Sequence, residues 1–108
     1  MKWTERVLEM KASGVVSEAD LADSRNYNCC LVGEAAHLLG QTWRNYRGES
    51  RANYDTVGRL LDNRTGINDV GGTFPRALQD GRLDEAEQLC YAVEDAVLQL
   101  KREGGGIS

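Results

Sequence analysis

Residues 28–40 read NCCLVGEAAHLLG and form the densest apolar run of the chain. On a helical wheel, one face of this run is apolar and consists of Leu31, Val32, Ala35, Ala36 and Leu39. The opposite face is polar and carries Cys30, Glu34, His37 and Gln41. We therefore expect a helix over about 27–39, capped by Ser24 or Asn26. Its apolar face should pack in the core, and Trp43 would extend that face if the helix continued.

Length and composition indicate one ordinary globular domain. The chain has 108 residues, of which 41% are hydrophobic and 28% charged. No apolar stretch approaches the ~20 residues that a transmembrane helix needs, and charged residues follow the first methionine closely, unlike a signal peptide. Three cysteines, two of them adjacent, favour reduced thiols and a cytoplasmic location. We expect a single helical domain over 1–103 and a flexible glycine-rich tail over 104–108.

Apolar periodicity predicts an all-α fold, a small bundle of four to five helices around a single core. The predicted helices cover about 4–13, 18–23, 27–39, 53–64 and 82–102, with a short helical turn at 74–80 after a glycine-bearing linker. The last helix has the clearest pattern, and with 27–39 it should form the core pair. Residues 40–53 allow two interpretations, an extension of the preceding helix or a long loop.

Local signals predict where some of these helices begin and end. Thr4 suits an N-cap, and Trp3 and Leu8 have the spacing of a hydrophobic staple across it. Ser17 and Asp20 have the spacing of a capping box, although glutamate or glutamine is usual at the second position. Thr65-Gly66 should end the helix over 53–64.

Charge is unevenly distributed along this acidic chain, whose net charge is -4. Residues 44–64 contain five arginines against three acidic residues, whereas residues 76–103 contain four basic and seven acidic residues. The basic middle and the acidic last helix could meet within the fold or across a self-association interface. We expect a homo-oligomer, with a dimer favoured.

Glu34 and His37 are the candidate metal ligands. A Glu-x-x-His pair places a carboxylate and an imidazole one helical turn apart, the spacing that ferritin-like di-iron bundles use twice. Because this chain has one histidine, a second subunit would have to complete the site. The simpler interpretation is that both residues lie on the solvated face of an amphipathic helix.

No catalytic constellation is predicted. Cys30 and His37 are separated by two helical turns, or ~10 Å, too far for a thiol–imidazole pair within one helix. Cys90 lies on the apolar face of the last helix, where cysteine behaves as a small hydrophobe. We therefore expect no enzyme activity and no cofactor.

The strongest candidate for partner binding is an arginine and aromatic segment at 43–51. Its residues are Trp43, Arg44, Tyr46, Arg47 and Arg51. Trp, Tyr and Arg dominate binding energy at protein interfaces, and they also stack on bases and bind phosphates. The structural alternative is that the aromatic residues anchor a loop to the core while the arginines pair with the acidic last helix.

These observations predict a small cytosolic, non-enzymatic binding or regulatory protein that acts through protein–protein contacts and not at a membrane. Small acidic proteins of this kind also occur as inhibitors carried by phages or mobile elements. A nucleic-acid-binding regulator that uses 43–51 is the first alternative, and a dimeric ferritin-like metal protein that uses Glu34 and His37 is the second. Gly81–Leu89 resembles the opening of a tetratricopeptide second helix, but a single copy predicts no repeat array.

Overall fold

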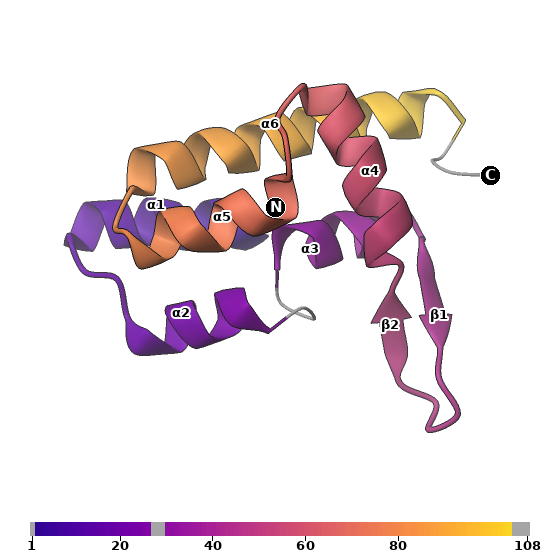
Figure 1. The fold of residues 1–108 in the computed structure, drawn as a ribbon, viewed down its shortest axis with the longest axis horizontal. Helices are drawn as coiled ribbons and strands as arrows, with labels where there is room; N and C mark the ends of the chain where they lie inside the picture. Colours follow the sequence, from indigo (N-terminus) through magenta and orange to yellow (C-terminus); the bar gives the residue numbers. More distant parts are fainter. Residues whose placement is uncertain (1, 27–29, 105–108) are drawn as a thin grey trace.

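The computed structural model describes residues 2–26 and 30–104, which form six helices and one two-stranded hairpin (Figure 1). In chain order the elements are α1 (Lys2–Ser13), α2 (Glu18–Arg25), α3 (Leu31–Leu38), β1 (Thr42–Arg44), β2 (Ser50–Ala52), α4 (Tyr54–Thr65), α5 (Val70–Gln79) and α6 (Leu83–Arg102). The predicted helical class is confirmed, with more helices than expected and a small sheet that was not expected. Within the described ranges, no helix is both long and apolar enough to cross a bilayer.

Helix α6 is the centre of the bundle. Helices α1 and α5 pack along it, and α3 and α4 contact it as well, so the predicted core pair is only part of a larger arrangement (Figure 1). Lys11 on α1 pairs with Asp84 at 2.7 Å and with Glu87 on α6. Asp84 and Glu87 at the acidic start of α6 are therefore paired by α1 and not by the arginine-rich middle of the chain.

The core is built from large side chains that solvent does not reach. Trp3 and Phe74 are the two largest of them, and their rings meet edge to face, with centroids 5.7 Å apart and an interplanar angle of 77°. Such a contact suits the quadrupoles of the two rings. It joins α1 to α5 on the side of α6 where both helices pack.

Helix α3 confirms the apolar face predicted for residues 28–40 but not the helix start. Leu31, Val32, Ala35, Ala36 and Leu39 are all buried. The helix begins after Cys30, whose Sγ caps it by accepting a hydrogen bond from the backbone N–H of Gly33 at 3.3 Å. The predicted caps were wrong because α2 extends through Ser24 and ends at Arg25, with Asn26 as its C-cap. Residues 27–29 of the predicted helix lie outside the described residues.

Helix α5 corrects the prediction of a short turn at 74–80. It starts at Val70, because Asp69 adopts a left-handed conformation (φ 54°) and accepts a hydrogen bond from the N–H of Gly72. Aspartate tolerates this conformation better than most residues. Two glycines that suggested a linker are therefore in the first turn, and Pro75 lies inside the helix.

The other local signals were partly right. Ser17 accepts from the N–H of Asp20, and Gly66 ends α4 in the left-handed conformation at φ 70°, as predicted. The predicted Thr4 cap was wrong, because Thr4 lies within α1 and donates a hydrogen bond to Glu94 Oε1 at 2.6 Å. Leu8 is exposed, so the expected staple with Trp3 does not form.

Residues 40–53 form neither of the two structures expected for them. The helix stops at Gly40, which has φ 68°, and the chain turns back on itself as the β1–β2 hairpin. The base of the hairpin is closed by a hydrogen bond from the N–H of Asn53 to the carbonyl of Gln41 at 3.0 Å. Ala52 is buried, so the base of the hairpin is attached to the core.

Candidate functional site

The β1–β2 hairpin projects from the helical body (Figure 1). Its strands pair antiparallel, with Thr42 opposite Ala52, Trp43 opposite Arg51 and Arg44 opposite Ser50. Because directly paired residues share one face of a sheet, Trp43 and Arg51 lie on the same side of the hairpin. The two strands carry solvent-exposed side chains except near the base.

Asn45 organises the turn at the tip of the hairpin. Its backbone carbonyl accepts from the N–H of Gly48, and its side-chain oxygen accepts from the N–H groups of Arg47 and Glu49 at 2.9 and 3.0 Å. Its side-chain amide donates to Glu49 Oε2 at 2.8 Å. Gly48 has φ 77°, a conformation that glycine adopts without strain. The tip therefore has a defined shape.

The hairpin surface, which we define as Trp43, Arg44, Tyr46, Arg47 and Arg51, contains all five residues that the sequence singles out for partner binding. Trp43 is 55% exposed and Tyr46 is 90% exposed. The alternative in which these two side chains anchor a loop to the core is therefore wrong. The structure places the five residues on one projecting element, and their role in binding stays a prediction.

The arginines of the hairpin surface pair locally. The Arg47 guanidinium lies over the Tyr46 ring, 5.4 Å from its centroid, and Arg51 pairs with Glu49 at 2.9 Å. Arg44 donates to the carbonyl of Gly48 at 2.9 Å. Arg64, in the basic middle of the chain, forms an ion pair with Glu103 at the end of α6, at a distance of 2.6 Å. Within the described residues, the basic middle therefore reaches the acidic last helix through Arg64, and a meeting across a self-association interface stays a prediction.

Glu34 and His37 both lie on α3, where Glu34 is half-buried and His37 is exposed. Across residues 2–26 and 30–104, no group of three histidine, cysteine, aspartate or glutamate side chains is arranged to hold a metal ion. Cys30, one turn before Glu34, is buried and caps the helix, so it does not belong to the polar stripe that was predicted. A metal site shared by two subunits stays a prediction.

Cys90 is buried in the core on α6, as its apolar surroundings in the sequence suggested. Burial disfavours the charged thiolate and raises the pKa of the Cys90 thiol to about 12. A thiol with so high a pKa is almost entirely protonated at neutral pH and is a poor nucleophile. The geometry therefore gives this cysteine a packing role.

The buried Cys90 thiol should make the protein less stable in alkali. The folded-state pKa lies above the value of 9.0 for a solvated thiol, so the unfolded chain releases its proton first. Stability is unaffected below pH 9 and falls as pH rises from 9 towards 12, by about 1.4 kcal/mol at pH 10. Urea unfolding at pH 7 and pH 10 of the natural chain and of Cys90→Ala measures this loss. An equal alkaline loss in both proteins would contradict it.

A pocket in the helical body was not predicted from the sequence. It has a volume of about 670 Å³ and lies between the end of α2, the start of α5 and one face of α4. The one sequence signal that could have indicated it is Gly58, a glycine in the middle of an otherwise regular helix.

Comparison of the chain with protein-family models, curated proteins and solved structures finds no match.

Proposed function

We propose that this is a small, non-enzymatic binding or regulatory protein whose hairpin surface contacts a protein partner. The observation that carries the proposal is the exposure of Trp43 and Tyr46, at 55% and 90%, on an element that projects from the helices. Neither ring contributes to the core. Arginines flank both rings, and Trp, Tyr and Arg are the residues that dominate binding energy at protein interfaces.

The conformation of the turn supports the proposal. Binding is weakened when a loop must be ordered at the interface, and Asn45 already holds the tip through five hydrogen bonds. The Arg47–Tyr46 contact restricts the two side chains at the tip in the same way. A partner would therefore meet a nearly preformed surface.

The chemistry of the hairpin surface suggests the kind of partner. A narrow projecting element fits a concave site, and the two aromatic rings would fill apolar pockets within it. Arg44 and Arg47 would face carboxylates at the rim of that site, because guanidinium groups bind carboxylates with two parallel hydrogen bonds. We propose a groove with an apolar floor and an acidic rim.

A site-specific photo-crosslinker tests this proposal. The benzophenone analogue of phenylalanine would replace Tyr46 in one protein and Tyr91 in a matched control, since Tyr91 is also exposed (45%) but lies on α6. After irradiation in native extract, we expect an adduct of discrete mass with another protein from position 46, and from position 91 no adduct other than a dimer of this chain. No adduct from position 46, or the same adduct from both positions, would contradict the proposal.

A nucleic acid is the second candidate partner. The arginines beside Trp43 and Tyr46 favour it, because aromatic rings stack on bases while guanidinium groups bind phosphates. The net charge of -4 and the carboxylate of Glu49 within the hairpin oppose it. Salt-dependent binding of labelled single- or double-stranded oligonucleotides, lost in Arg44→Gln/Arg47→Gln, would replace the protein partner with a nucleic acid.

Our proposal also includes self-association and a cytosolic location. Tyr91 and Leu98 are exposed on the outer face of α6, where a second copy could cover them. Light scattering should detect a dimer, and a monomer at all accessible concentrations would refute self-association. The free thiol of Cys90 is consistent with a reducing compartment.

A further inference from the structure

Helix α6 carries a regular row of residues on the side that faces away from the core. Its buried residues repeat at intervals of three and four, and so do six exposed residues on the opposite side. We define these six residues as the outer row: Asp84, Gln88, Tyr91, Asp95, Leu98 and Arg102. Alternating intervals of three and four are the spacing at which helices pair in coiled coils. Helix α6 therefore has the pattern of a packing face on both of its sides.

The middle of the outer row is hollowed. An open groove of about 430 Å³ lies there, and all of its lining residues belong to α6: Gln88, Tyr91, Ala92, Glu94, Asp95 and Leu98. In paired helices, a side chain of one helix enters a hole between residues i, i+3, i+4 and i+7 of the other. The groove consists of two adjoining holes of this kind, one starting at Gln88 and the other at Tyr91. Its shape therefore suits the side chains of a second helix.

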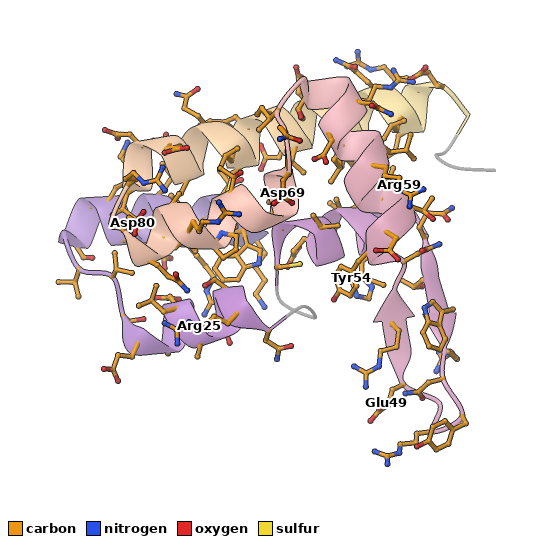
Figure 2. All side chains as sticks on the ribbon, viewed as in Figure 1. Arg25, Glu49, Tyr54, Arg59, Asp69 and Asp80 are labelled. Carbon is orange, nitrogen blue, oxygen red and sulfur yellow. The ribbon has the colours of Figure 1, made fainter. Side chains whose placement is uncertain are left out.

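The helices that pack on α6 leave the outer row uncovered. Tyr91 is 45% exposed and Leu98 is 52% exposed, although α1, α3, α4 and α5 all contact α6. The hairpin is remote from it as well, since Glu49 near the hairpin tip lies on the opposite side of the molecule from α6 (Figure 2). Among the parts of the chain that the structure describes, none fills the groove, so we consider a helix from another molecule as its occupant.

The charges of the outer row indicate a second copy of α6 as that helix. The row begins with acidic Asp84 and ends with basic Arg102, and Asp95 lies between them. Two copies that ran in the same direction would place each of these charges against the same charge of the other copy, which is unfavourable. In the antiparallel direction, the acidic end of one helix meets the basic end of the other. The charge pattern therefore favours an antiparallel pair.

We propose that two copies of this chain pair along α6 in an antiparallel, two-fold symmetric dimer. The register with the largest overlap places the two-fold axis at the level of Val93. Three contacts then repeat on either side of the axis: Asp84 with the partner's Arg102, Gln88 with the partner's Leu98, and Tyr91 with the partner's Asp95. The inference rests on the self-association in the proposed function, and it does not involve the hairpin surface.

The polar side chains of the outer row are available for these contacts. Within residues 2–26 and 30–104, no side-chain hydrogen bond or ion pair is formed by Tyr91, Asp95 or Arg102. Asp84 pairs with Lys11 at 2.7 Å, yet its side chain is still 91% exposed. Glu94, the other acid that lines the groove, accepts a hydrogen bond from Thr4 on α1 at 2.6 Å, so its charge already has a partner.

Charge exchange in the full-length protein tests the proposed contacts. Sedimentation equilibrium should give a dimer for the natural chain. Arg102→Asp should raise the dimer dissociation constant at least about tenfold, because two pairs of like charges replace two ion pairs. Asp84→Arg in the same chain should return the constant to within about threefold of its natural value. Arg25→Asp, a matched charge reversal at an exposed position of α2, should leave it unchanged, and circular dichroism would verify folding.

Cysteine cross-linking tests the direction of the two helices. A mixture of Gln88→Cys and Leu98→Cys should form a mixed disulfide under mild oxidation, whereas neither variant alone should cross-link. The natural chain, with its three cysteines, gives the background. A monomeric natural chain would overturn both self-association and this arrangement. A dimer that Arg102→Asp leaves unchanged, or that gives no mixed disulfide, would overturn the arrangement alone.

Discussion

Replacing Phe74 with alanine is expected to lower the free energy of unfolding by about 3–5 kcal/mol. Phe74 is completely buried, and its ring meets Trp3 edge to face at 5.7 Å. The substitution removes buried apolar surface and leaves a cavity between α1 and α5 that the surrounding backbone fills only partly. Since the total free energy of unfolding of a small domain is about 5–15 kcal/mol, the expected loss is a large share of it. Urea unfolding followed by circular dichroism measures the loss.

A matched control separates the effect of the core from that of a smaller side chain. Leu98→Ala lies on α6 at a position that is 52% exposed, and it should change stability by less than about 0.5 kcal/mol. A double-mutant cycle with Trp3→Ala should give about 0.5–1.5 kcal/mol for the ring contact. A loss below about 1 kcal/mol for Phe74→Ala would show that the packing between α1 and α5 is not as described.

Replacing both Trp43 and Tyr46 with serine is expected to weaken partner binding at least ~100-fold. Each ring is exposed on the hairpin surface, and each would lose the apolar contact that it makes in a pocket of the partner. The effect is on binding alone, because neither side chain contributes to the core. Isothermal titration calorimetry with the partner captured at position 46 measures the affinity, and urea unfolding measures the stability.

The control for this experiment uses two other exposed apolar residues. Tyr91→Ser/Leu98→Ser removes a similar amount of exposed surface from α6. This double variant should leave the affinity for the partner within about threefold of that of the natural chain, because both residues lie outside the hairpin surface. Equal losses of affinity in both double variants would refute the assignment of the interface to the hairpin.

Local sequence signals predicted the longer regular helices well. The apolar repeat of α6, with its acidic first turn and basic last turn, corresponds to a helix that spans 83–102. The apolar face of α3 and the Gly66 stop of α4 were also right. In each case the signal is contained in neighbouring residues of one helix, so the sequence pattern alone is sufficient to predict that feature.

The hairpin and α5 could not be predicted in the same way. Strands of three residues are too short to show an alternating pattern, and their pairing depends on the turn that Asn45 and Gly48 form. Helix α5 starts after Asp69, which has a rare left-handed conformation, and it has two glycines in its first turn, which local propensity assigns to a linker. Tertiary packing outweighs that preference, because Val70 and Phe74 are completely buried.

The sequence by itself determined a helical protein with a central last helix, and it identified the arginine and aromatic residues of 43–51. Residues 28–40, the densest apolar run, do supply a buried face through α3. Only the tertiary structure decided that Trp43 and Tyr46 are exposed on a hairpin, that Lys11 of α1 pairs with the acidic start of α6, and that a pocket lies between α2, α4 and α5. The physical reason is that helical periodicity is a local property, whereas exposure, ion pairing and pockets depend on which distant segments pack together.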